Sequence, residues 1–293
     1  MRVTNNMMAR QMLSNFNKGL ERLARLNDQL SSGKTITRPS HNPAGAPQIM
    51  RLKTGLMEIE QYRRNADEMV SWLETTDSAL NAVGEALHRA RELVIRGASS
   101  GLPEESYQAL ADEMGQLLEG IVDIANSSHG ARYIFAGQKT TAPPFAFDAD
   151  GKVVYQGDQG PLQAELGVGI TMTYNVLGDA VFEKIFEAVE KARDALEAGD
   201  SNALGNDVLK ELTQALDDTL RWRSEVGSKV NRLQMTGERI TDAQLNLTKL
   251  LSDVEDIDVA KVIMELKMEE NAYQAALASG ARILQPTLLD YLR

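Results

Sequence analysis

The 293-residue chain contains no cysteine. This absence excludes disulfide bonds, thiolate catalysis and cysteine-ligated zinc, so packing alone must stabilise the fold. Aromatic residues are also scarce, at 5% against 43% for all hydrophobic residues. Leucine, alanine, valine, isoleucine and methionine therefore carry the burial, which suits helix packing better than a β-sandwich core.

Long hydrophobic runs are missing as well. No stretch approaches the roughly 20 uncharged apolar residues that a membrane-spanning helix needs, and residues 1–13 lack the apolar core of a signal peptide. We therefore expect a soluble chain whose export, if any, does not use such a signal. The net charge of -11 argues against a general nucleic-acid binder, because that role needs a basic face.

The two ends of the chain carry matching apolar stripes at steps of three and four residues. Near the start the stripe consists of Leu13, Phe16, Leu20, Leu23 and Leu30, with the polar Asn27 in the one remaining position. Near the end it consists of Leu266, Tyr273, Leu277, Leu284, Leu288 and Tyr291, with Glu270 and Gly280 in intervening positions. A stripe this narrow is typical of a coiled coil, and an isolated helix cannot bury it. We predict that these residues form an assembly interface.

The charges of the two ends favour their docking. Residues 1–40 are predominantly basic and residues 255–293 predominantly acidic. Exposed ion pairs contribute only about 0 to 1 kcal/mol each, so this complementarity sets orientation more than strength.

Between the ends, two long segments repeat apolar residues every seven positions. The first repeat, inside a helix expected from about Gln48 to Arg96, consists of Leu52, Ile59, Ala66, Leu73, Leu80, Leu87 and Val94. Its second row begins with Ile49, Leu56 and Val70 but is interrupted by Arg63, Asp77, Gly84 and Arg91. The second repeat consists of Val226, Leu233, Ile240, Leu247 and Val254. These segments predict two long helices packed antiparallel.

The spacing of apolar residues changes from a helical to a strand-like period in one segment, which indicates a β insertion. Residues 145–147 and 153–155 flank an Asp150-Gly151 turn, which predicts a hairpin. We therefore expect a mainly α protein with a small β insertion, an elongated antiparallel helical hairpin. The expected domains are residues 1–45 with 255–293, a helix bundle of 46–134 with 179–254, and a β-rich domain of 135–178.

Motifs that suggest chemistry are incomplete. Gly33-Lys34-Thr35 lacks the earlier glycine of a phosphate-binding loop, because Asp28 stands there. We expect Gly33 to end the first helix instead. The Asp148-to-Gly151 turn lacks the later ligands of a calcium loop. The acidic group of Asp253, Glu255, Asp256 and Asp258 predicts a solvated junction between two helical segments more than a cation site. His41, His88 and His129 lie in separate elements, and no nucleophile, base and orienting group are grouped together. We expect no catalytic residues, no cofactor and no metal, and hence no enzyme.

Three motifs resemble the flagellin superfamily, and in particular its hook-associated junction proteins. They are LNDQLSSGK at residues 26–34 with the loop of residues 39–46, GARYIFAG at 130–137, and the ending EENAYQAA to LQPTLLDYL at 269–292. The resemblance covers both helical arms and excludes most of the β insertion.

This resemblance implies a structural adaptor of the bacterial flagellum, secreted through type III export and cytoplasmic before that. It would assemble as a ring at the extracellular hook–filament junction, between the first hook-associated protein and flagellin. An export chaperone and the export gate would be further partners, and the terminal helices would form a coiled coil on assembly. The nearest alternative is flagellin itself, the filament subunit. A membrane-surface coiled coil, supported only by the basic N-terminal helix, is a weaker one.

Overall fold

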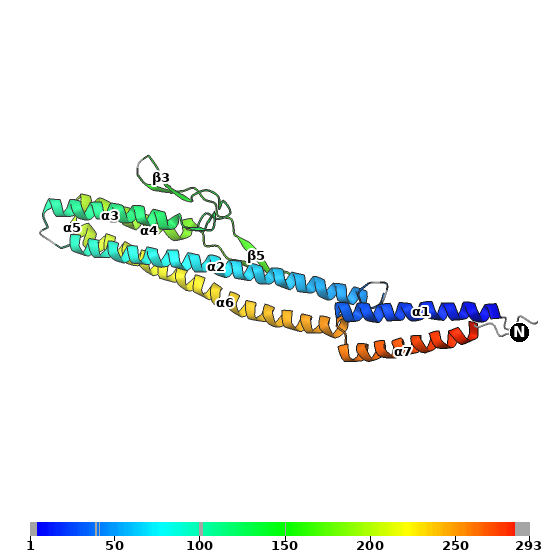
Figure 1. The fold of residues 1–293 in the computed structure, drawn as a ribbon. Helices are drawn as coiled ribbons and strands as arrows, with labels where there is room; N and C mark the ends of the chain where they lie inside the picture. Colours follow the sequence, from blue (N-terminus) through cyan, green and yellow to red (C-terminus); the bar gives the residue numbers. More distant parts are fainter. Residues whose placement is uncertain (1–4, 39, 41, 100–101, 150, 285–293) are drawn as a thin grey trace, which may run out of the picture. The chain divides into compact units, whose positions relative to one another are not determined.

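The structure is a computed structural model that describes residues 5–38, 40, 42–99, 102–149 and 151–284 (Figure 1). The chain forms two compact units. The first, called the terminal unit, comprises Met1–Glu58 and Ala243–Arg293. The second, called the central unit, comprises Ile59–Asp242.

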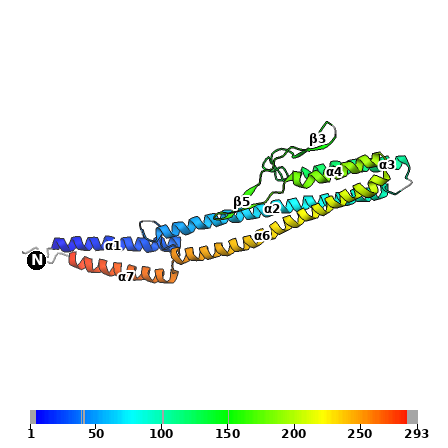
Figure 2. The same cartoon turned by 180° about the vertical axis from the view of Figure 1, so that it is seen from behind.

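In the terminal unit, the two end helices α1 (Asn5–Ser32) and α7 (Val259–Leu284) lie side by side in both views (Figures 1 and 2). Helix α1 ends where the sequence predicts, because Gly33 adopts a left-handed conformation with φ of 70°. At the start of α7 the carboxylate of Asp258 accepts a hydrogen bond from the backbone N–H of Lys261 at 3.1 Å, which caps the helix. The unit also contains the start of α2 (Ala46–Gly97) and the end of α6 (Leu209–Glu255).

The central unit packs most of α2 and α6 with α3 (Glu104–Ala125) and α4 (Gly178–Glu197). A short α5 (Ser201–Ala203) and a π-helical turn (Leu204–Val208) precede α6. Leu204 and Val208 of this turn are both buried in the core. Helix α3 ends at Ala125, shortly before residues 128–133 form a small hairpin.

The predicted seven-residue row on α2 is buried in the central unit from Ala66 to Val94. The second row lies one position away from the prediction. The buried residues are Met69, Thr76, Val83 and Ala90, whereas Arg63 and Arg91 are exposed and Asp77 binds Arg223 of α6. Trp72, Ala79 and Leu93 are buried too, so the apolar stripe is wider than that of a two-stranded coiled coil. It is wide because α2 packs against several elements at once.

The β segment consists of three antiparallel strand pairs. They are β1 (Ser128–His129) with β2 (Arg132–Tyr133), β3 (Phe145–Phe147) with β4 (Val153–Tyr155), and β5 (Gln163–Gly167) with β6 (Ile170–Thr173). The predicted hairpin is confirmed: Phe145 pairs with Tyr155 and Phe147 with Val153, and Gly151 in the turn has φ of 73°.

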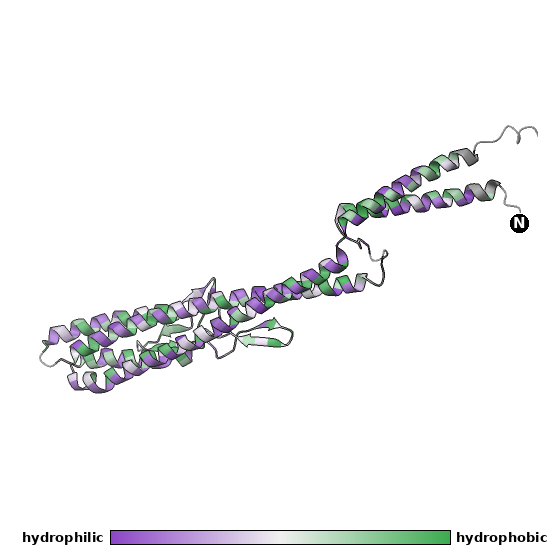
Figure 3. Cartoon of the chain, turned by 90° about the horizontal axis from the view of Figure 1, so that it is seen from below, coloured by the Kyte–Doolittle hydropathy of each residue, from purple (hydrophilic) through white to green (hydrophobic). Residues whose placement is uncertain are grey.

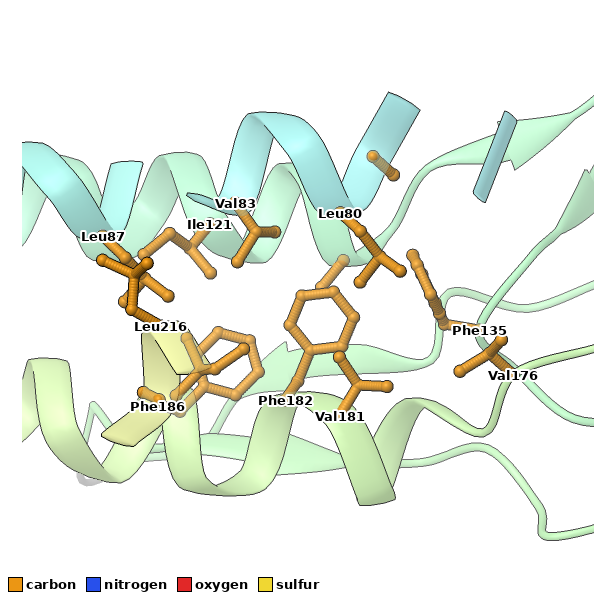
Figure 4. Packing of buried hydrophobic residues seen from close by; sticks show 14 of the residues in the cluster. Leu80, Val83, Leu87, Ile121, Phe135, Val176, Val181, Phe182, Phe186 and Leu216 are labelled. Carbon is orange, nitrogen blue, oxygen red and sulfur yellow. The ribbon is translucent and has the colours of Figure 1, made fainter. Parts of the chain in front are cut away.

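Aromatic rings fix this segment to the helices. Figure 4 shows Phe135, Phe182 and Phe186 pointing into the space between α2 and α4. The rings of Phe135 and Phe182 are 4.8 Å apart in an edge-to-face arrangement, and Phe145 of β3 lies 5.2 Å from Phe186. The sparse aromatic content of the chain is therefore concentrated where strands meet helices. The predicted fold class, mainly α with a small β insertion, is confirmed.

Candidate assembly interface

The contact between α1 and α7 is a narrow seam of small and apolar side chains. On α1 it consists of Met12, Phe16, Gly19, Leu23, Leu26 and Leu30, and on α7 of Val262, Leu266, Tyr273 and Gly280. The α1 positions alternate steps of four and three residues, the repeat of a coiled coil. Leu26 and Val262 are each only 7% exposed. The seam is therefore best buried at the C-terminal end of α1 and the N-terminal end of α7, where the two helices join the rest of the unit.

Two glycines let aromatic rings enter this seam. A Cβ atom on Gly19 would lie 3.3 Å from Cδ2 of Tyr273. A Cβ atom on Gly280 would meet the methyl group of Met12 first and would lie 3.1 Å from Cζ of Phe16. The two rings also meet each other edge to face, with centroids 5.9 Å apart. Each helix thus receives an aromatic residue of the other opposite a glycine.

One ion pair crosses the seam. The guanidinium of Arg22 donates hydrogen bonds to Oε1 of Glu269, with Nη2 at 2.5 Å, and these raise the pKa of Arg22. Arg22 is half exposed, so this contact adds orientation more than stability. No other ion pair joins the two helices among their described residues. Within the described parts of α1 and α7, opposite charges therefore pair at one point.

The structure separates the predicted interface residues into groups. Phe16, Leu23, Leu30, Leu266 and Tyr273 are half-buried in or beside the seam. Leu13 is 62% exposed, Leu20 48% and Leu277 45%, and Asn27 is exposed. Leu284 is the last described residue of α7, and Leu288 and Tyr291 lie outside the described residues.

Sequence reasoning missed half of the α1 seam by one position. It selected Leu13, Leu20 and Asn27, whereas Met12, Gly19 and Leu26 face α7. Leucine is a stronger hydrophobic signal than glycine, so the pattern favoured Leu20 over Gly19. The feature of the sequence that could have identified the seam is a glycine on each helix that faces an aromatic residue on the other.

The exposed leucines lie on one flank of the helix pair. On a helix of 3.6 residues per turn, Leu13 and Leu20 lie on the flank of α1 opposite to Lys18 and Arg25. A groove lined by Asn15 and Arg22 of α1 and by Ala272 and Ser279 of α7 marks the charged side of the pair.

Ile263 and Leu277 lie on the flank of α7 opposite to Ala272 and Ser279. They therefore share the other side of the pair with Leu13 and Leu20, and Ile263 is 45% exposed. Met264 and Met268, 61% and 71% exposed, point away from α1. Green hydrophobic residues accordingly occur on both terminal helices in Figure 3. Helix α7 is thus apolar on more faces than its partner covers.

A buried carboxylate joins the connections at the base of this pair. Glu255, at the end of α6, is 4% exposed and accepts hydrogen bonds from Nζ of Lys53 at 2.6 Å and of Lys34 at 2.9 Å. Burial favours the protonated acid, but the two lysines outweigh it and lower the pKa of Glu255. The hydrogen bond to Glu255 also raises the pKa of Lys34.

Backbone hydrogen bonds reinforce this junction. The N–H of Thr35 donates to the carbonyl of Glu255 at 2.6 Å, and the N–H of Ile257 donates to the carbonyl of Gly33 at 3.1 Å. The loop after α1 is therefore held to the linker before α7. The sequence suggested a solvated acidic junction here, but Glu255 is enclosed because both lysines reach it.

The described residues show neither a metal-binding group nor a membrane-spanning helix. They contain no group of three or more histidine or acidic residues placed to hold a metal ion. Within the same described ranges, no helix has the length and apolar character needed to cross a bilayer. Gly33 acts as a helix stop and Lys34 as a partner of Glu255, not as a phosphate-binding loop.

The family model for the bacterial flagellin N-terminal helical region matches residues 3–140, and that for the C-terminal helical region matches residues 209–292. The chain belongs to the bacterial flagellin family. Flagellar hook-associated protein 3 of Salmonella typhimurium is 26% identical, over 94% of this chain and 95% of that protein. A flagellin of Bacillus subtilis is 24% identical, over 97% of both chains.

Solved structures agree in fold. FlgL of Bacillus cereus superposes with a TM-score of 0.60 and 26% identity, over 69% of this chain and 99% of that one. Hook-associated protein 3 of Legionella pneumophila has a TM-score of 0.66 at 17% identity, over 70% of this chain and 98% of that one, and supports the fold alone. The matches to hook-associated proteins favour a junction component of the flagellum over the filament subunit.

Proposed function

We propose that this chain is a structural adaptor at the bacterial hook–filament junction. The observation that carries the proposal is the apolar surface that the α1 and α7 pair leaves uncovered: Leu13, Leu20, Ile263 and Leu277 on one flank, and Met264 and Met268 on the back of α7. Monomeric soluble proteins rarely expose such patches unless a partner covers them. The relatives named as hook-associated protein 3 indicate which assembly supplies that partner.

The mechanism that we propose is folding coupled to assembly. The α1 and α7 pair rests on one narrow seam, and two helices with a single seam are marginally stable in water. Neighbouring subunits would cover the exposed flank and so stabilise both helices when the chain is incorporated. Before incorporation the weak seam would keep the ends unfolded enough for export and would limit premature polymerisation.

The partners follow from this role. A hook-side junction protein would contact the chain on one side and flagellin on the other, and copies of the chain would form a closed ring. An export chaperone would cover the C-terminal stripe of residues 255–293 in the cytoplasm, before passage through the export gate. The twelve predicted interface residues are the proposed contacts, with the exposed Leu13, Leu20 and Leu277 facing other subunits and Tyr273 and Phe16 holding the pair together.

Deleting the gene in the host tests the proposal. We expect non-motile cells whose hooks are complete but carry no filament, with flagellin released into the medium. Electron microscopy of the cells and immunoblotting of the medium check this result, and expression of the gene from a plasmid is the control.

The same experiment separates the alternative. If the chain is flagellin itself, the deletion strain will lack filaments, and no flagellin encoded by another gene will be released into the medium. Purified chain would then also polymerise alone into long filaments. Either result would contradict the adaptor role.

A further inference from the structure

Methionine is the only sulfur-containing residue of this chain, which has 12 methionines and no cysteine. Apart from Met12, which is half-buried in the seam, the methionines whose side chains are described fall into two groups. Met69, Met114 and Met172 of the central unit are at most 7% exposed. Those at least 60% exposed are Met7, Met50, Met57, Met264 and Met268 in the terminal unit and Met235 in the central unit. Reactive thioethers are therefore concentrated in the terminal unit.

Met264 and Met268 stand four residues apart on the back of α7, one helical turn from each other. Their side chains belong to the apolar surface that α1 does not cover. A flexible thioether suits contact with partners of different shape, but it also makes the surface chemically vulnerable. Oxidation replaces an apolar group with a polar sulfoxide.

We propose that Met264 and Met268 are peroxide-sensitive modification sites whose oxidation blocks incorporation of the subunit without unfolding it. The reaction is a two-electron oxidation in which the thioether sulfur attacks one oxygen of hydrogen peroxide. The sulfur–oxygen bond forms, the oxygen–oxygen bond breaks, and the second oxygen leaves as water. The central core is spared because its methionines are enclosed. This inference rests on the proposed assembly role of α7.

The cost of burying a polar sulfoxide determines how much oxidation weakens incorporation. Burying a polar group without a hydrogen bond is unfavourable, and a tenfold change in affinity corresponds to about 1.4 kcal/mol. We therefore expect oxidation of both methionines to weaken incorporation by about tenfold or more.

The test treats purified full-length chain with hydrogen peroxide and measures its cosedimentation with hook–basal bodies from cells that lack the gene. Peptide mass spectrometry locates the added oxygen atoms. We expect oxygen on Met264 and Met268 before Met69 and Met114, unchanged far-UV circular dichroism, and loss of binding. The variant M264L/M268L should bind after peroxide treatment, whereas the control M235L should lose binding like the wild type.

The outcomes are distinguishable. If untreated wild type does not bind the hooks, the proposed function fails. If untreated chain binds and chain oxidised at both positions binds equally well, the oxidation proposal fails while the proposed function stands. Equal oxidation rates for Met264 and Met114 would also overturn it. Chain already bound to hooks should resist oxidation at Met264 and Met268, because the partner covers them.

Discussion

At the scale of single residues, glycine and a buried carboxylate determine the terminal unit. Gly19 and Gly280 are weak hydrophobic signals, yet they create the space that Tyr273 and Phe16 occupy. Glu255 looked like one acid among several in a solvated turn, but two lysines enclose it. A sequence pattern scores each residue by its own chemistry. Gly19, Gly280 and Glu255 act through the residues that face them in the folded chain, so the sequence pattern could not identify them.

Glu255 gives the junction a pH dependence with a definite sign. Its pKa in the folded chain lies below its ordinary value of 4.5, because hydrogen bonds from Lys53 and Lys34 overcome the effect of burial. Its stabilising contribution is therefore complete above about pH 4.5 and is lost as the pH falls through the lowered pKa. The variant Glu255→Gln removes the charge, and we expect it to cost about 1 to 3 kcal/mol at neutral pH.

Amide exchange of Thr35 and Ile257, corrected for the intrinsic effect of pH, measures this contribution. The protection that wild type has over Glu255→Gln should be constant above about pH 4.5 and should shrink below it. The exposed Glu265, changed to Gln, is the matched control and should alter neither amide. A difference that grows in acid would contradict the argument.

At the scale of elements, the sequence predicted where helices begin and end better than which way they face. The α1 stop at Gly33, the β3–β4 hairpin and the long α2 helix follow from local turn chemistry and period, and all are confirmed. On both α1 and α2, one predicted row of buried residues lies one position away from the row that the structure buries. A helix turns by 100° per residue, so adjacent positions both lie near a broad stripe. Only the packed neighbours decide between them.

This displacement makes a paired test possible on α1. Leu23 is half-buried at the seam, so Leu23→Asp should place a charge there and separate α1 from α7, with lower helicity by circular dichroism. Leu20 is 48% exposed, so Leu20→Asp should leave helicity unchanged, yet it should abolish binding to hooks because it charges the flank. If Leu20→Asp bound normally, that flank would not be an assembly surface. If it lost helicity, Leu20 would belong to the seam.

At the scale of the whole molecule, the central unit supplies the stable core and the terminal unit supplies the proposed assembly surface. The central unit has one large apolar core that includes α2, α3, α4 and α6, although Val168 and Leu220 of this unit are exposed. The terminal unit instead leaves leucines, isoleucine and methionines exposed along α1 and α7. Local opening costs less where few apolar contacts hold a segment, so the two units should open with very different free energies.

Amide exchange over the full-length monomer measures that difference. We expect α2 from Ala66 onward, together with α3 and α4, to exchange slowly because their core residues are enclosed. Helices α1 and α7 should exchange orders of magnitude faster, since a single narrow seam holds them. The same α1 and α7 amides should become protected when the chain is bound to hooks, while the central unit stays unchanged. Slow exchange of α1 in the free monomer would mean that the pair is stable alone, and folding would then not be coupled to assembly.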